Sequence, residues 1–171
     1  GSYITGNTMQ KIKAPGAALG ILNALRDARL EPSRLELEIT ETVLLDHSQN
    51  TESFINELAQ AGVRFALDDF GTGYSSLSYL KRLPLNRIKI DKSFVRGLPA
   101  DKENLAIVRT IVALARNLGF TLVAEGIETL EQACLLRDME CEALQGSYIS
   151  EPVAAEAVPA LLAARWPLAA T

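Results

Sequence analysis

Short apolar runs alternate with longer amphipathic segments along almost the whole sequence. The longer segments carry apolar residues at helical spacing, which predicts helices at 17–28, 53–61, 76–81, 105–118, 131–139 and 154–164. The short runs predict strands at 35–40, 63–67, 87–91, 120–124 and 142–145. This alternation indicates an α/β fold with a parallel sheet. Because the strands are apolar in mid-course, both faces of the sheet are expected to be covered.

Polar side chains stand at or near the carboxyl ends of these expected strands: Glu38, Asp68, Asp69, Lys89, Glu125 and Gln145. The carboxyl ends of parallel strands meet at one open face, where active sites lie in (β/α) barrels. A TIM-like (β/α) barrel is favoured over a doubly wound sheet, because the functional side chains come from every strand and not from one switch point. In addition, no glycine-rich nucleotide fingerprint follows the first strand. Five strands cannot close an eight-stranded barrel. The barrel is therefore expected to be incomplete, with its first βα units missing, or to be completed by another copy.

Size and charge narrow the class of protein. The 171 residues suit a single domain, and a hydrophobic content of 48% suits a substantial core. A net charge of −4 argues against a partner that is a DNA or RNA polymer or a membrane surface.

No apolar run reaches the ~18 residues that span a bilayer, and no signal peptide is visible. We therefore expect a cytoplasmic location, with a membrane anchor elsewhere in the parent protein left open. We interpret residues 1–13 as a tag or unassigned segment and 14–171 as the partial domain.

The segment Leu67–Gly73 places two adjacent carboxylates at a strand end, before a Gly-Thr-Gly turn. Carboxylate oxygens are the ligands that Mg²⁺ and Mn²⁺ prefer. Together with Glu38 and Glu125, this pair would put four like charges at one barrel mouth, and divalent ions would relieve their repulsion. Two ions roughly 4 Å apart can clamp a phosphodiester, and Lys89 could offset charge in the transition state.

Five motifs occur in a fixed order: Leu37–Glu41, Asp68–Leu77, Ile88–Phe94, Ala124–Thr129, and Gln145-Gly146 followed by Ser150–Pro152. Together they resemble the EAL-domain family of bacterial cyclic-di-GMP phosphodiesterases, over residues 17–164. The resemblance implies a TIM-like barrel that uses two Mg²⁺ or Mn²⁺ ions and is inhibited by Ca²⁺. It also implies hydrolysis of cyclic-di-GMP to linear pGpG.

The resemblance assigns metal ligands on three of the strands. Glu38 would bind a metal ion, Asp68 would bridge the two ions, and Asp69 would bind the second. Glu125 would be a further metal ligand or a base near the attacking water. Each of these residues occupies a position that matches the family motif in this sequence.

Four other residues receive supporting roles from the same resemblance. Lys89 would contact the attacking water, and Glu128 and Gln145 would support the site. Glu41 would anchor the loop that begins at Asp69, which in the family links dimerisation to metal binding. A homodimer is therefore expected, and the parent protein is expected to carry sensor or GGDEF domains.

Two elements of the family are not found in the sequence. The opening Glu-Ala-Leu glutamate is absent, and Asn7-Thr8-Met9 does not match the family's Asn-x-Ser. Three functions therefore stay open: a phosphodiesterase, a catalytically inactive module that binds cyclic-di-GMP and signals, and a non-binding dimerisation piece. Missing first units also predict exposed apolar surface and self-association.

Overall fold

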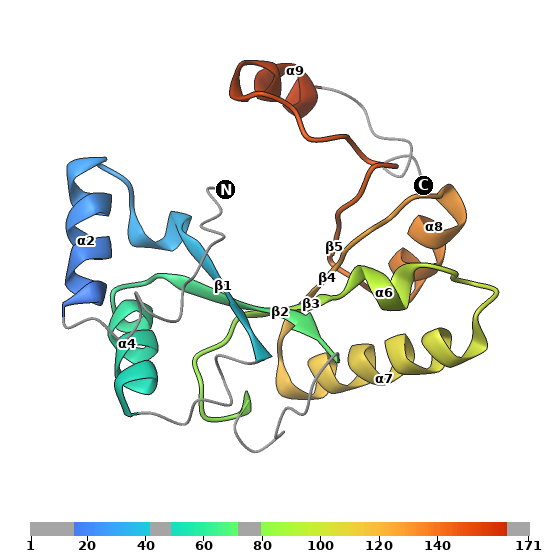
Figure 1. Cartoon of the computed structure of the whole chain (residues 1–171), viewed down its shortest axis with the longest axis horizontal. Coiled ribbons are helices and arrows are strands. Elements are labelled where there is room, and N and C mark those ends of the chain that lie inside the picture. Colours follow the sequence, from blue (N-terminus) through green and yellow to red (C-terminus); the bar gives the residue numbers. More distant parts are fainter. Residues whose placement is uncertain (1–15, 42–48, 72–79, 164–171) are drawn as a thin grey trace. The chain divides into compact units, whose positions relative to one another are not determined.

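A computed structural model gives the fold and describes residues 16–41, 49–71 and 80–163 (Figure 1). Its helices are α2 (Ala17–Asp27), α4 (Gln49–Gln60), α6 (Lys92–Val95), α7 (Lys102–Leu118), α8 (Leu130–Asp138) and α9 (Val158–Ala163), with 3₁₀ turns η1 (Pro32–Arg34) and η2 (Ala155–Ala157). The strands are β1 (Glu36–Thr40), β2 (Arg64–Phe70), β3 (Arg87–Ile90), β4 (Thr121–Ala124) and β5 (Ala143–Leu144). Over the described residues, the strand order in the sheet is β1-β2-β3-β4-β5.

The chain divides into two compact units, which are described separately. The first unit holds α2, β1, α4 and β2, and the second holds α6, α7, β4, α8, β5 and α9. Strand β3 passes from one unit to the next between Ile88 and Lys89. Strand β1 pairs with β2 in parallel in the first unit, and β4 pairs with β5 in parallel in the second, which confirms the predicted parallel α/β class.

In the first unit, strand register separates an apolar face from a polar face. Ile39 pairs with Leu67, and both are buried. Helix α4 contacts β2 and α2 contacts α4, so the helices lie beside the strands (Figure 1). Because side chains alternate along a strand, Glu38 and its partner Ala66 lie on the face opposite Ile39. The polar positions of β1 thus lie on the other side of the sheet from its apolar contacts.

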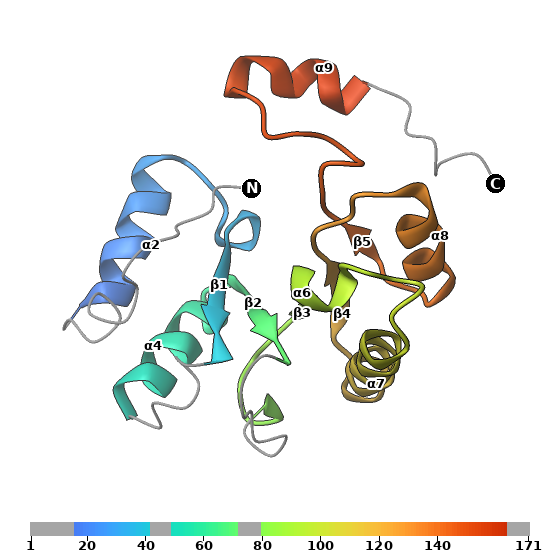
Figure 2. The ribbon, with the colours of Figure 1, turned by 45° about the vertical axis from the view of Figure 1, so that its right-hand side comes forward.

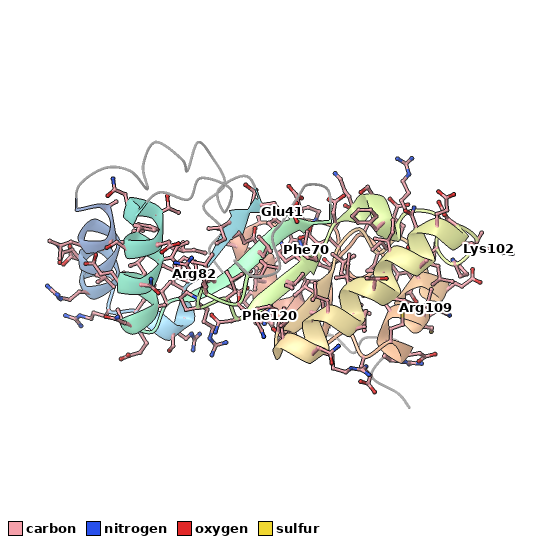
Figure 3. All side chains as sticks on the ribbon, turned by 90° about the horizontal axis from the view of Figure 1, so that it is seen from below. Glu41, Phe70, Arg82, Lys102, Arg109 and Phe120 are labelled. Carbon is pink, nitrogen blue, oxygen red and sulfur yellow. The ribbon has the colours of Figure 1, made fainter. Side chains whose placement is uncertain are left out.

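In the second unit, helices and strands both supply buried apolar residues. Helix α7 buries Val108, Ile111, Val112 and Ala115, and α8 buries Ala133 and Leu136. Helix α8 contacts β5, and Figure 2 shows α6, α7 and α8 with the strands of this unit. Lys102 and Arg109 are exposed on α7 (Figure 3). The 3.6-residue spacing of the buried α7 residues is the pattern from which the helix is predicted.

Helices α4 and α7 begin four and three residues before the predicted helices at 53–61 and 105–118. Three further differences are larger or concern whole elements. Strand β2 continues to Phe70, so Asp68 and Asp69 lie inside it and not beyond its end, because the ladder with β1 continues through the Thr40–Asp68 pair. The four-residue helix α6 was not predicted. The expected helix at 154–164 is a 3₁₀ turn followed by α9 from Val158, and most of the expected helix at 76–81 lies outside the described residues.

Among the described helices, none has the length and hydropathy of a membrane span. Large apolar side chains are exposed on α2, shortly after it, on α7 and α8, and near the end of the described chain: Leu19, Leu30, Ile107, Leu130, Val153, Val158 and Leu162. Self-association through such surface stays a prediction.

Candidate functional site

Two of the predicted metal ligands share one face of the first unit. Glu38 is paired in register with Ala66, and Asp68 lies two residues further along β2. Side chains two apart on a strand point to the same face, so Glu38 and Asp68 lie on the same side of the β1–β2 pair. Both side chains are half-buried. Their oxygens are hard ligands that suit Mg²⁺ or Mn²⁺.

Asp69 interrupts the regular alternation of β2. Its φ is 55°, in the left-handed region, which aspartate tolerates better than most residues. Phe70 directly after it is buried, with 6% of its surface exposed. The turn at Asp69 therefore redirects the end of the strand, so the direction of the Asp69 side chain does not follow from the strand period.

Glu41 joins the ends of β1 and β2. It follows β1 directly (Figure 3) and is buried. Its Oε1 accepts a hydrogen bond from the Gly71 N–H at 3.3 Å. Its Oε2 is also buried and has no hydrogen-bond partner in the part of the chain that is described. A carboxylate buried in this way fixes the backbone that follows Asp69 and Phe70. The link from this contact to dimerisation stays a prediction.

The second unit brings a cation and a carboxylate together. Lys89 Nζ lies 2.6 Å from Glu125 Oε1, and the two side chains are 7% and 18% exposed. Lys89 is in β3, and Glu125 follows β4, where its N–H donates to the Ile90 carbonyl at 3.1 Å. A charge-assisted contact with this little exposure to water is held much more firmly than a surface ion pair.

Gln145 lies beside Glu125. The β4–β5 register pairs Ala124 with Leu144, so the next residues along are Glu125 and Gln145. The Gln145 N–H donates to the Ala124 carbonyl at 2.9 Å, and its carbonyl accepts from the Ile127 N–H at 3.1 Å. A Cβ atom on Gly146 would lie 2.2 Å from the backbone N and O of Ile127. The two loops thus meet backbone to backbone, which only glycine permits at this position.

Glu128 and Gln145 are the two exposed residues among the predicted site residues. The backbone N–H of Glu128 donates to Gln132 Oε1 at 2.8 Å. That bond belongs to the start of α8, where Thr129 and Gln132 form a capping box. A supporting role for the Glu128 carboxylate stays a prediction.

The predicted residues therefore come together within each unit. Glu38 and Asp68 share a face in the first, and Lys89, Glu125 and Gln145 lie together in the second. The carboxylates fit a divalent cation by their chemistry. Over the described ranges, however, no three His, Cys, Asp or Glu side chains form a group that could hold a metal ion.

The buried amide of Gln132, which is 4% exposed, was not among the predicted site residues. The spacing of Thr129 and Gln132 is a capping-box signature and could have located it. The close approach at Gly146 was not predicted either, because a single sequence offers no signal for it beyond the glycine itself.

Comparisons with known proteins give a consistent result. The sequence model of a family described as "EAL domain" matches residues 7–152. The chain is 42% identical to cyclic di-GMP phosphodiesterase NbdA of Pseudomonas aeruginosa over 144 residues, which are 84% of this chain and 18% of NbdA. It is 43% identical to the bifunctional diguanylate cyclase/cyclic di-GMP phosphodiesterase MucR of the same organism, over 86% of this chain and 22% of MucR. The chain thus spans about a fifth of the length of these relatives.

Solved structures extend the similarity to the fold. The MucR phosphodiesterase in complex with c-di-GMP is 40% identical and superposes with a TM-score of 0.84, over 91% of this chain and 62% of that one. Klebsiella pneumoniae BlrP1 in a manganese/c-di-GMP complex is 36% identical with a TM-score of 0.72, over 80% of this chain and 35% of that one. A calcium/c-di-GMP complex of BlrP1 also matches. These similarities confirm the predicted fold, an α/β architecture of the TIM-like type.

Proposed function

Because the chain belongs to the EAL domain family, we propose that it is a cyclic-di-GMP phosphodiesterase domain. It hydrolyses one phosphodiester of cyclic-di-GMP and releases linear pGpG. The names of NbdA and MucR, and the c-di-GMP complexes of MucR and BlrP1, support this substrate.

One observation in this chain carries the proposal: the Lys89–Glu125 contact of 2.6 Å at the carboxyl ends of β3 and β4, next to Gln145. A simple structural ion pair does not require an amide beside it on an adjacent strand end. A cation, a carboxylate and an amide placed together can orient a water molecule and a phosphate oxygen.

The carboxylates supply the site for divalent ions. Glu38, Asp68, Asp69 and Glu125 would hold two Mg²⁺ or Mn²⁺ ions, with Asp68 between the two. When bound, two such ions lower the pKa of the attacking water and stabilise the departing oxygen. The manganese complexes of BlrP1 support this choice of metal, and its calcium complex supports Ca²⁺ as an ion that permits binding without turnover.

The side chains of the second unit act on the water and its proton. The Lys89 ammonium donates a hydrogen bond to the attacking water, and the Glu125 carboxylate attracts the proton of that water. The water oxygen forms a bond to phosphorus, the P–O3′ bond breaks, and the 3′ oxygen takes a proton to become the hydroxyl of pGpG. Gln145 beside Glu125 holds the phosphate in line for this displacement.

Assembly forms the second part of the proposal. Glu41 and the loop after Phe70 belong to a homodimer contact, supported by the buried bond between Glu41 and Gly71. The parent protein carries further domains, such as GGDEF or sensor domains, supported by the bifunctional name of MucR and by the small share of each relative that this chain covers.

A direct assay tests the enzyme. The 171-residue chain is incubated with cyclic-di-GMP and Mg²⁺ or Mn²⁺, and pGpG is measured by chromatography. Glu125→Gln should lose turnover by about 1,000-fold, because the amide can neither attract a proton nor carry charge. Calorimetry with Ca²⁺ should still detect cyclic-di-GMP binding to this variant.

Glu131→Gln is the matched control, because Glu131 is an exposed glutamate in the first turn of α8. It should turn over like the wild type. Binding without turnover by the wild type would favour the inactive signalling module instead, and neither binding nor turnover would favour a dimerisation piece.

A further inference from the structure

The buried amide of Gln132 holds the loop that carries Glu125. Its Oε1 accepts hydrogen bonds from the N–H groups of Glu128 at 2.8 Å and Thr129 at 3.2 Å. These residues close the loop that leaves β4 at Glu125. With 4% of its surface exposed, Gln132 makes these bonds out of contact with bulk water, where losing one is costly.

The other end of the same amide reaches a different part of the second unit. Gln132 Nε2 donates to the carbonyl of Val95 at 3.3 Å, 37 residues away along the chain. Val95 is the last residue of α6, a helix that begins three residues after Lys89. One side chain therefore joins the segment after β3 to the segment after β4.

The loop and α6 also approach each other at the first residue of the helix. Gly126 has a φ of 70°, and a Cβ atom there would lie 2.5 Å from the Cβ of Lys92. The backbone after Glu125 thus runs directly against the start of α6, while Gln132 binds its end. Two contacts, one at each end of α6, set the distance between the segments that follow Lys89 and Glu125.

The geometry points to Gln132 as a positioning residue for the Lys89–Glu125 pair. It acts by joining the loop after β4 to α6, and it does not touch substrate or metal. The expected effect of Gln132 on turnover rests on the proposed phosphodiesterase function. The expected effect of Gln132 on the Lys89–Glu125 distance does not depend on activity. A capping role for α8 alone would need the Oε1 bonds and not the bond to Val95.

Two variants separate these roles. Gln132→Met keeps the volume and removes all three hydrogen bonds. Gln132→Glu keeps an acceptor for Glu128 and Thr129 and preserves the capping box, but its carboxylate cannot donate to the Val95 carbonyl. Both variants should lower kcat by about 10-fold, with KM for cyclic-di-GMP within about twofold of wild type. A loss of this size is typical when a residue that orients catalytic side chains, without touching the substrate, is removed.

Leu136→Ala is the control, because Leu136 is fully buried on the same helix and makes none of these hydrogen bonds. At a temperature where every variant is folded by circular dichroism, it should keep the wild-type kcat. Wild-type kcat in Gln132→Glu, or an equal loss in Leu136→Ala, would overturn the inference.

Crystal structures of the wild type and both Gln132 variants give a measure without turnover. The Lys89 Nζ–Glu125 Oε1 separation, 2.6 Å here, should exceed the ~4 Å limit of an ion pair in both variants. An unchanged separation in both would overturn the inference. If the wild type made no pGpG while the variants still opened the pair, the proposed function would fail and the positioning role would stand.

Discussion

The two units place their functional side chains by different means. In the first, regular strand register is sufficient: Glu38 and Asp68 share a face because β1 and β2 pair in parallel. In the second, Glu125 and Gln145 lie just beyond their strands. Backbone bonds between loops, the close approach at Gly146 and the Gln132 amide hold them there.

This difference determines how substitutions should affect activity and stability in each unit. A side chain that regular register places can be changed without disturbing the strand that carries it, so chemistry and stability separate in the first unit. The position of a side chain in a loop depends on many small contacts. In the second unit, a change to a loop residue with no chemical role should therefore still lower activity. Four predictions follow from this contrast, in order of decreasing effect.

Asp68→Asn should have the largest effect on activity and little effect on stability. The amide keeps the shape but removes the charge that would bridge two ions, so kcat should fall by about 1,000-fold and half-maximal activity should need more Mn²⁺. Because the strand register is unchanged, the free energy of unfolding should move by less than about 1 kcal/mol. Initial rates over a Mn²⁺ titration and urea unfolding measure the two quantities.

Asp27→Asn, at the exposed end of α2, is the control for Asp68→Asn and should change neither quantity. A large loss of stability in Asp68→Asn would contradict the separation of chemistry from stability in the first unit, because it would mean that Asp68 supports the fold.

Gly146→Ala should destabilise the second unit. The new methyl group would lie 2.2 Å from the backbone N and O of Ile127, so one of the two loops must move. We expect the free energy of unfolding to fall by about 3 kcal/mol, the upper range for overpacking against rigid atoms. Activity should fall with it, because Gln145 precedes the substituted residue. Urea unfolding and the pGpG assay measure both.

The first unit offers a matched glycine. Gly20 lies inside α2, and a Cβ atom there would meet nothing within 4 Å. Gly20→Ala should therefore stabilise the chain by about 0.5 to 1 kcal/mol, since alanine is the better helix former. Equal effects at Gly146 and Gly20 would contradict the difference drawn between the units.

Lys89→Met should remove the cation from the ion pair with Glu125. Removing one partner of a largely buried ion pair is unfavourable, and because Glu125 keeps 18% exposure we expect a loss of about 2 kcal/mol. The double variant Lys89→Met/Glu125→Gln should recover part of this loss, because both charges of the pair are removed together. Urea unfolding of the two single variants and the double variant forms the test. Strict additivity would show that the 2.6 Å contact contributes nothing to stability.

The sequence predicted what depends on short-range periodicity. Every strand expected from apolar runs is present, and the long helices α2, α7 and α8 lie within a few residues of their predicted bounds. Asp68 and Asp69 were placed wrongly beyond β2, because acidic residues were read as the end of the strand. The pairing of Thr40 with Asp68 keeps them in the ladder.

What the sequence could not predict depends on contacts between distant segments. The resemblance indicated Lys89 and Glu125 as site residues, but not that they form an ion pair across 36 positions in the chain. Gln132 has the sequence pattern of an ordinary helix start, and its hydrogen bond to the Val95 carbonyl joins it to another helix. The short helix α6 was missed because four residues show no period, although Asp91 caps it by accepting from the Ser93 N–H.

The last prediction concerns a thiol of the second unit that lies outside the site. Burial, with a further contribution from the charge of Glu142, raises the pKa of Cys141 from its ordinary 9.0 to about 11. Because the folded state keeps the proton more tightly, this stability is complete below pH 9 and is lost as the pH rises toward 11. At pH 10 the loss should be about 1.4 kcal/mol relative to pH 8.

Urea unfolding at pH 8 and pH 10 isolates the contribution of Cys141, when the wild type is compared with Cys141→Ala and Cys134→Ala. Cys141→Ala lacks the titrating group, so its stability should fall between the two pH values by about 1.4 kcal/mol less than that of the wild type. Cys134 is only half-buried, so Cys134→Ala should behave like the wild type. An equal fall in the free energy of unfolding of all three proteins would show that Cys141 is more exposed to water than the packing between α8 and β5 indicates. The second unit would then be less tightly packed around Cys141 than the structure shows.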